Sequence, residues 1–193
     1  MKLNRRNFIF GTAAAATLAG CNTMKTGARP LKPGEKRRAA MIGYGIQMRT
    51  VLLPSFLNPK YAPNVEVVAV CDCDKVRAKA GAEQVNKAYG TDSCKAVADF
   101  RDILKDPTID MVCIGTPDHW HGIIAIAAMR AGKHVFTEVP SAFTVDECWE
   151  LVETSEKTKR HCMQLENCCY GDMEMLALNL CRLGKFGDLV HGE

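Results

Sequence analysis

Two glycines and a carboxylate further along the chain could together bind a dinucleotide. Gly43-Tyr44-Gly45 follows a predicted strand over 38–42 and precedes a helical pattern. Glycines at such a turn let the backbone approach a pyrophosphate, and a helix start presents free N–H groups and a positive dipole end. A two-glycine match alone also fits an ordinary tight turn. The nucleotide interpretation predicts cofactor contacts from Gly43, Gly45, Met48 and Arg49, with Met48 in place of the usual third glycine.

Asp72 supplies the second half of this pattern. It follows a predicted strand over 65–70 and stands 24 residues after Met48. The acid that accepts the adenosine ribose hydroxyls lies about 20 residues after such a turn. Because a carboxylate repels a 2′-phosphate, Asp72 favours NAD over NADP. Asp74 is typical of a helix cap, while Lys75 and Arg77 are typical of solvated helix charges but leave NADP open.

A third predicted strand, 110–115, ends in Thr116–His121. Open α/β sheets bind ligands outside the carboxyl ends of their strands, so this stretch is a candidate for cofactor contact. A helix is predicted over 122–131 and is ended by Gly132. Taken alone, His121 is typical of a helix start and Trp120 of a packing residue.

Two further strands complete the repeating strand-helix pattern. The strand 134–137 ends in Glu138-Val139-Pro140, and the strand 162–165 ends in Glu166-Asn167. Between them, the capping box Thr144–Glu147 predicts a helix to about Lys159, with Trp149 in the core.

These motifs resemble the Gfo/Idh/MocA oxidoreductases. Sugar dehydrogenases of that superfamily usually read Glu-Lys-Pro where this chain reads Glu138-Val139-Pro140, and their lysine polarises a substrate hydroxyl during hydride transfer. Valine has no group for this chemistry. A branch that reads Glu-Val-Pro, followed by Glu-Asn-Cys-Cys-Tyr, is family 109 of the glycoside hydrolases, and this chain carries that string at 166–170.

The resemblance implies a fold and a set of site residues. The fold is α/β, a Rossmann-type doubly wound and mostly parallel sheet over 38–166, with the start of a C-terminal α+β substrate domain at 167–193. Tyr170 is the candidate acid/base, although it could also be a packed aromatic, and Asn167 contacts NAD unless it is only a turn residue. The remaining implied cofactor contacts are Asp118, His119, Trp120, His121, Glu138 and Val139.

The implied chemistry is glycoside cleavage with NAD as an intermediary. A hydride leaves C3 of the sugar, the ketone acidifies the C2 proton, the glycosidic bond breaks by elimination, water adds and the ketone is reduced. Relatives act on terminal N-acetylgalactosamine. Two alternatives remain open: an NAD-dependent sugar or inositol dehydrogenase, and a non-catalytic NAD-binding module.

The N-terminus resembles an export signal. Asn4–Ile9 matches the twin-arginine pattern, and the apolar run 8–19 has twelve residues, too few for the roughly 20 that span a bilayer. Leu18–Cys21 matches a lipoprotein cleavage box, so we expect lipid on Cys21. Residues 1–21 would then be the signal and 22–37 a flexible tether, and the protein would be a periplasmic lipoprotein held to the membrane by lipid only.

Composition narrows the partners. Three of the 25 basic residues precede Cys21, and the rest of the chain holds 22 basic against 22 acidic residues. Without a basic stripe, nucleic acid is not an expected partner. A glycan or glycoside substrate is expected. Residues 188–190 resemble the opening strand of a further domain, so the chain resembles an N-terminal fragment. A homo-oligomer could form through the rest of that substrate domain.

The cysteines favour free thiols. Nine follow Cys21, an odd number, and Cys113, Cys148 and Cys162 lie in predicted strands or helices, where cysteine packs as a small hydrophobe. The pairs 71/73 and 168/169 lack the spacing of zinc ligands, so no metal is expected.

Overall fold

The computed structural model describes residues 30–166, 169 and 171–191. Six parallel strands form one sheet in the order β3-β2-β1-β4-β5-β6. The strands are β1 (Arg37–Ile42), β2 (Val65–Cys71), β3 (Lys95–Val97), β4 (Met111–Ile114), β5 (His134–Thr137) and β6 (Cys162–Gln164). This is the doubly wound order in which the crossover direction reverses between β1 and β4. The predicted fold class is confirmed.

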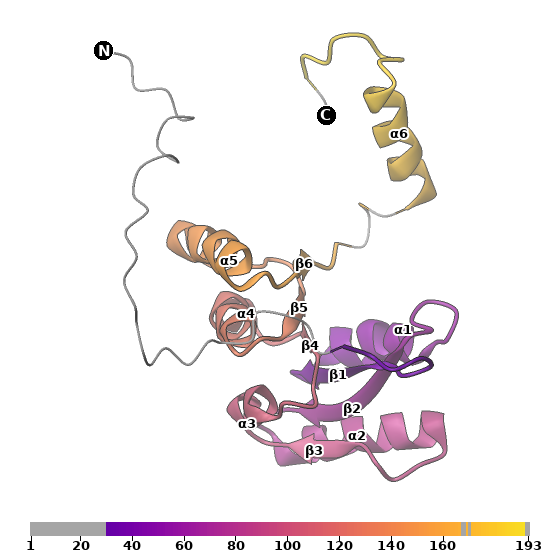
Figure 1. The fold of residues 1–193 in the computed structure, drawn as a ribbon, viewed down its shortest axis with the longest axis vertical. Coiled ribbons are helices and arrows are strands. Elements are labelled where there is room, and N and C mark those ends of the chain that lie inside the picture. Colours follow the sequence, from indigo (N-terminus) through magenta and orange to yellow (C-terminus); the bar gives the residue numbers. More distant parts are fainter. Residues whose placement is uncertain (1–29, 167–168, 170, 192–193) are drawn as a thin grey trace.

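Helices cover both faces of the sheet (Figure 1). One face carries α3 (Phe100–Lys105), α4 (His121–Arg130) and α5 (Val145–Thr158), and the other carries α1 (Leu53–Leu57) and α2 (Lys75–Tyr89). A π-helical turn, η2 (Met48–Leu52), leads into α1, and a short 3₁₀ turn, η3 (Asp118–Trp120), leads into α4.

The strands alternate between two cores because successive side chains point to opposite faces. In β1, Ala40 and Ile42 pack with the α3, α4 and α5 side, whereas Ala39 and Met41 pack with the other side. Both cores are built almost wholly of apolar side chains, which explains the continuous hydrophobic runs of the central strands.

The helix caps follow the sequence. Asp74 accepts the backbone N–H groups of Val76 and Arg77 at the start of α2. Thr144 and Glu147 form the predicted capping box at the start of α5. The observed strand and helix ends differ from the predicted ones by about a residue, as is usual for helix and strand ends.

Three expectations were wrong. Trp149 is 67% exposed, because α5 turns Leu151 and Thr154 inward and a residue two positions away points to the other side of a helix. Cys148, beside it, is also exposed. Residues 188–190 are exposed and belong to no strand, since no described residue pairs with them.

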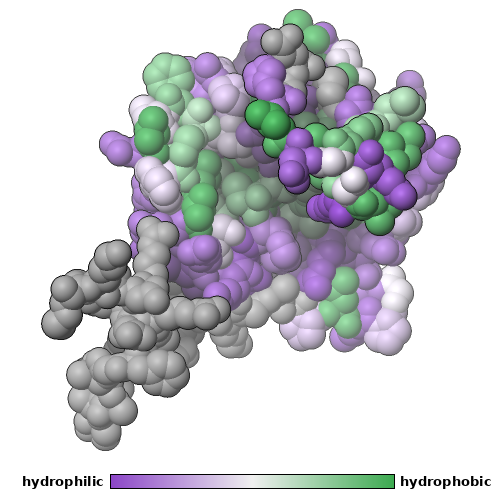
Figure 2. Space-filling model, turned by 90° about the horizontal axis from the view of Figure 1, so that it is seen from above, coloured by the Kyte–Doolittle hydropathy of each residue, from purple (hydrophilic) through white to green (hydrophobic). Residues whose placement is uncertain are grey.

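The end of the molecule that bears α5 and α6 (Asp172–Arg182) shows apolar side chains at its surface (Figure 2). None of the residues of α6 is buried, and Figure 1 shows this helix away from the sheet. The described cysteines, eight in all, are free, and Cys113 is fully buried in β4. In the described part of the chain, no helix is long and apolar enough to cross a membrane.

Candidate functional site

A cleft of about 680 Å³ opens at the carboxyl edge of the sheet. Its lining comes from the turn after β1, the ends of β2 and β3, and the loop after β4. These segments meet where the strand order reverses, the place at which doubly wound sheets bind nucleotides. Of the predicted site residues, the cleft is lined by Gly43, Gly45, Asp72 and Trp120.

Gly43 is required by the close approach of two chain segments. Its φ is +86°, and a Cβ placed there would lie 2.7 Å from the carbonyl oxygen of Gly115, at the end of β4. Gly45 has a different role, since a Cβ there would have no neighbour nearer than that same oxygen, at 4.0 Å. Gly45 therefore keeps the backbone open toward the cleft.

Met48 and Arg49 do not line the cleft. Met48 is fully buried, and its Cε would lie 3.1 Å from a Cβ built on Gly115. The methionine fits the third-glycine position because Gly115 leaves room for it. Arg49 is exposed on the helical turn η2. Its backbone N–H donates to the carbonyl oxygen of Gly45 at 3.0 Å.

Asp72 holds the glycine turn as well as facing the cleft. Its Oδ2 accepts the backbone N–H of Tyr44 at 2.7 Å, and its Oδ1 accepts that of Asp74 at 2.8 Å. The side chain is 9% exposed. A carboxylate has about four lone-pair positions, so capacity remains for ribose hydroxyls. That contact stays a prediction.

Two arginines line the cleft, and each forms an ion pair within the protein. Arg77 Nε lies 3.7 Å from Asp74, and Arg101 Nη1 lies 3.2 Å from Asp99. The hydrogen bond from the Arg101 backbone is the main cause that lowers the pKa of Asp99. Both ion pairs are largely exposed and therefore weak, so the arginines leave NADP open while Asp72 favours NAD.

Trp120 faces an aromatic partner that the sequence analysis missed. The rings of Trp120 and Phe100 have centroids 6.3 Å apart and planes at 62°, and both residues line the cleft. The Arg101 guanidinium lies 4.9 Å from the Phe100 ring centroid. A signal was present, because Phe100 follows β3, whose carboxyl end lies at this edge.

Asp118 and His119 lie exposed at the rim. The Oδ1 of Asp118 accepts the backbone N–H of His119 at 2.8 Å and lies 3.5 Å from His119 Nδ1. Neither residue lines the cleft itself, and contact with a cofactor stays a prediction.

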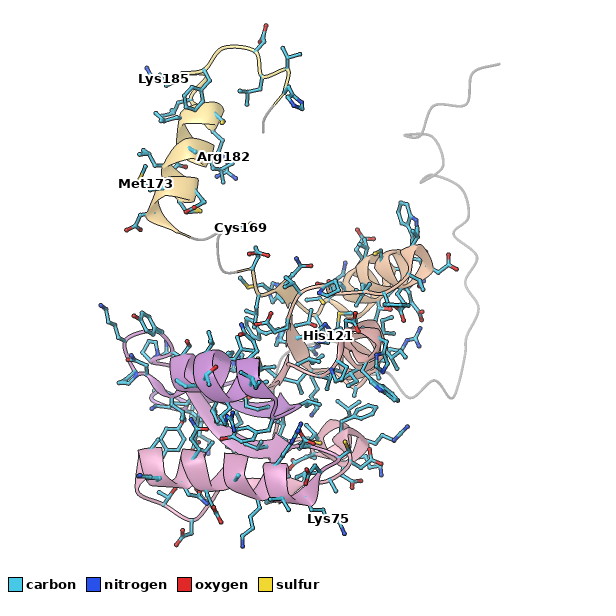
Figure 3. All side chains as sticks on the ribbon, turned by 180° about the vertical axis from the view of Figure 1, so that it is seen from behind. Lys75, His121, Cys169, Met173, Arg182 and Lys185 are labelled. Atoms are coloured by element: carbon cyan, nitrogen blue, oxygen red, sulfur yellow. The ribbon has the colours of Figure 1, made fainter. Side chains whose placement is uncertain are left out.

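His121 begins α4 and does not line the cleft, so its expected contact with a cofactor stays a prediction. It is 2% exposed, and Figure 3 shows it within the body of the domain. Nδ1 lies 2.7 Å from the carbonyl oxygen of Pro140, and Nε2 lies 2.7 Å from that of Thr116. Because both ring nitrogens are engaged by the backbone, the imidazole holds loops rather than facing the cleft.

Glu138 is buried, and Val139 beside it is exposed. Glu138 Oε1 accepts from the side-chain amide of Gln47 at 3.0 Å, and Oε2 accepts the backbone N–H of Val139 at 3.1 Å. Gln47 lines the cleft and was also missed, because its partner lies 91 residues away in the chain. The Val139–Pro140 peptide bond is cis. Val139 presents an apolar side chain near the sheet edge, where a lysine would present an ammonium group.

Three predicted residues lie outside the described part of the chain, namely Cys21, Asn167 and Tyr170. Glu166, which precedes Asn167, follows β6 by two residues and therefore lies at the carboxyl edge of the sheet. Across the described residues, no three or more His, Cys, Asp or Glu side chains gather as a metal site would need.

The residues present fit a dinucleotide. The backbone at Gly45 has no neighbouring atom that would block a ligand. The buried carboxylate of Asp72 lies at the end of β2, and the rings of Phe100 and Trp120 lie beside each other in the cleft lining. Thr116 also lines the cleft, and its Oγ1 is buried without a hydrogen-bond partner among the described residues. A polar group of a bound ligand would satisfy that hydroxyl.

Comparison with known proteins agrees with this geometry. The model of the Gfo/Idh/MocA oxidoreductase family, NAD-binding Rossmann fold, matches residues 37–165. A glycosyl hydrolase family 109 protein from Solibacter usitatus is 43% identical over 83% of this chain and 37% of its own length. One of the same name from Saccharopolyspora erythraea is 38% identical over 98% of this chain and 44% of its own. The chain thus spans less than half the length of these curated relatives.

Solved structures show the same fold. The WlbA dehydrogenase from Chromobacterium violaceum, in complex with NADH and UDP-GlcNAcA, has a TM-score of 0.69 and 26% identity, covering 82% of this chain and 43% of that one. An NAD-binding oxidoreductase from Klebsiella pneumoniae has a TM-score of 0.65 and 26% identity, covering 79% and 40%. The family match, the sheet order and the cleft agree: the chain belongs to the Gfo/Idh/MocA oxidoreductase family and forms its NAD-binding Rossmann domain.

Proposed function

We propose that the complete protein is an NAD-dependent glycosidase that acts on a terminal N-acetylgalactosamine or a related sugar. The observation that carries this proposal is Val139, whose apolar side chain agrees with the glycosyl hydrolase names of the relatives. Relatives with 34% to 43% identity are named glycosyl hydrolase family 109 proteins. Val139, an exposed apolar residue, follows the buried Glu138 at the edge where a dehydrogenase lysine is expected.

When bound, NAD would supply a reversible hydride acceptor for C3 of the sugar. The proton of the C3 hydroxyl would pass to a base as the hydride leaves, and both would return in the final reduction. The C3 ketone acidifies the proton on C2, so a modest base suffices to remove it. The electron pair left on C2 expels the glycosidic oxygen from C1. Water then adds at C1, a proton returns to C2, and reduction of the ketone restores the hydroxyl, leaving no net oxidation.

The described residues contribute binding and orientation to this scheme. Asp72 and the glycine turn lie at the dinucleotide end, and Trp120 lies in the loop after β4. Tyr170 remains the proposed acid/base and Asn167 a proposed cofactor contact. The sugar site itself would be completed by the part of the relatives that this chain does not span.

A net sugar dehydrogenase is the competing function. It is favoured by the likeness to the WlbA dehydrogenase, whose structure contains NADH and a nucleotide sugar. It is opposed by Val139, since a valine side chain cannot polarise a hydroxyl. The two functions differ in whether reduced cofactor accumulates.

The deciding experiment uses the complete gene product with a chromogenic N-acetylgalactosaminide in heavy water. The glycosidase releases the chromophore without net NADH and exchanges the C2 hydrogen for deuterium, because only the ketone intermediate acidifies that position. A dehydrogenase accumulates NADH in proportion to product. A hydrolase using paired carboxylates releases the chromophore without C2 exchange, and either of these last results would overturn the proposal.

Location is a separate proposal. The twin-arginine pattern and the cleavage box before Cys21 support export in a folded state and attachment by lipid in the periplasm. A folded precursor could load NAD in the cytosol before export, which suits an enzyme whose cofactor is regenerated in each turnover.

A further inference from the structure

Gln47 and Glu138 connect two segments that leave the sheet at separate strands. Nε2 of Gln47 donates to Oε1 of Glu138 at 3.0 Å, across 91 positions of the chain. Gln47 follows the glycine turn after β1 and precedes η2, whereas Glu138 follows β5. In the sheet, β4 lies between β1 and β5, so this hydrogen bond crosses the end of a strand to which neither residue belongs.

The backbone hydrogen bonds between these strands end just before the two side chains meet. The N–H of Gly115 donates to the carbonyl oxygen of Ile42 at 2.8 Å, and the N–H of Glu138 donates to that of Ile114 at 2.9 Å. Both bonds join a segment to β4, and β1 and β5 do not pair with each other. The side-chain hydrogen bond from Gln47 therefore links the glycine turn directly to the loop after β5.

The carboxylate of Glu138 holds the backbone of its own loop. The residue is 8% exposed, and its Oε2 accepts the backbone N–H of Val139 at 3.1 Å. A buried charged group that loses one of its hydrogen-bond donors is left with an uncompensated desolvation cost. The donor from Gln47 thus fixes the position of the carboxylate and, through it, the position of Val139.

Gln47 also lines the cofactor cleft, together with Gly43 and Gly45. A carboxylate only accepts hydrogen bonds, so the amide turns its NH₂ group toward Glu138. One amide proton makes that bond, which leaves the second proton and the carbonyl oxygen of Gln47 with capacity for a group in the cleft. The same side chain can therefore contact a bound ligand and hold the loop 138–140.

We propose that Gln47 is a positioning residue that couples occupation of the cofactor cleft to the position of the loop 138–140. A cofactor bound against the glycine turn restrains Gln47, and Gln47 then restrains the Glu138 carboxylate and the Val139 N–H that it accepts. This loop carries the valine that replaces the dehydrogenase lysine. The inference depends on cofactor binding alone, so it can fail while the glycosidase reaction stands, and the reverse.

Amide hydrogen exchange of the complete protein, with and without saturating NAD, tests the coupling. In the unsubstituted protein, NAD is expected to slow exchange at the turn 43–49 and at Val139. Gln47→Met keeps an unbranched side chain of similar length but has no donor. In this variant NAD should still slow exchange at the turn, whereas its effect at Val139 should fall by roughly tenfold or more, as expected for the loss of one hydrogen bond to a charged group. Equal protection of Val139 in both proteins, or protection in neither, would overturn the proposal.

A charge swap tests the same contact by rescue. Gln47→Glu sets two carboxylates against each other across the 3.0 Å contact and is expected to weaken NAD binding, measured by calorimetry, by roughly tenfold or more. Adding Glu138→Gln returns an amide donor to the pair from the opposite side and should restore most of the lost affinity. Ile46→Glu is the matched control, since it adds the same charge to the same turn on a side chain that is 75% exposed. Adding Glu138→Gln to this control should restore nothing. Rescue of both variants, or of neither, contradicts the assignment.

Discussion

The backbone N–H of Tyr44 donates to Oδ2 of Asp72 at 2.7 Å, across 28 positions of the chain. This hydrogen bond ties the glycine turn, which is expected to contact the pyrophosphate, to the carboxylate that is expected to contact the ribose. Tyr44 is itself buried, and burial raises the pKa of its hydroxyl. The two halves of the dinucleotide pattern thus form one unit, and a change at Asp72 should affect both.

Replacing Asp72 with Ala is expected to weaken NAD binding. A hydrogen bond to a charged group contributes about 1.5 to 3 kcal/mol, which corresponds to roughly 10-fold to 150-fold in affinity. Bound nucleotide released on denaturation of the purified complete protein measures the effect. Asp146→Ala, at the exposed start of α5, is the control. Equal NAD retention in the Asp72 variant would remove the ribose assignment.

Gly43 and Gly90 make a matched pair of substitutions. Both have positive φ, +86° and +67°, but a Cβ on Gly43 would meet Gly115 at 2.7 Å whereas one on Gly90 would meet nothing within 4 Å. Left-handed backbone costs a non-glycine residue about 1 to 2 kcal/mol, so Gly90→Ala should lose only that amount. Gly43→Ala should lose more and should also lose NAD binding. Chemical denaturation of both variants, with and without NAD, measures this, and similar losses would contradict the proposed strand contact.

His134 should make the stability of the domain depend on pH. Its ring stacks on His161 with centroids 5.2 Å apart, and its Nδ1 accepts the His161 backbone N–H at 3.1 Å. Burial lowers the pKa of His134 below 6.5, and nearby positive charges, with Arg160 first among them, lower it further.

The sign follows from this shift. When the folded pKa is depressed, the unfolded chain binds more protons, so stability is present above about pH 6.5 and is lost as pH falls below it. Thermal unfolding is therefore expected at a lower temperature near pH 5 than near pH 7. His134→Asn, whose carbonyl can still accept the backbone N–H, should reduce that difference, whereas His191→Asn, at an exposed site, should not. An unchanged pH dependence in His134→Asn would rule out His134 as its source.

Membrane attachment should depend on Cys21. If this cysteine carries the lipid, Cys21→Ser blocks processing and abolishes labelling with a radioactive fatty acid. Cys73→Ser, at an exposed thiol within the domain, should label as the unsubstituted protein does. Labelling that survives in Cys21→Ser would mean that the cleavage box has been misidentified.

Local patterns in the sequence determined much of this domain. Apolar runs predicted the central strands, the offset from the glycine turn placed Asp72 at the end of β2, and Asp74 and Thr144 cap the helices that they were expected to cap. The strands and caps depend on residues only a few positions apart, and the place of Asp72 depends on where its strand ends. The spacing of apolar residues and the hydrogen-bonding groups of the capping side chains are therefore enough to predict them.

Only the tertiary structure decided where several side chains point. His121 turns inward to two carbonyls, Trp149 turns outward, and Gln47 reaches Glu138 from the far side of the switch point. Each outcome depends on which elements pack against each other over long chain separations. The sequence around a histidine or tryptophan in the first turns of a helix does not show whether its side chain faces a ligand, a loop or solvent. That direction is set by neighbours that come close only when the sheet has assembled.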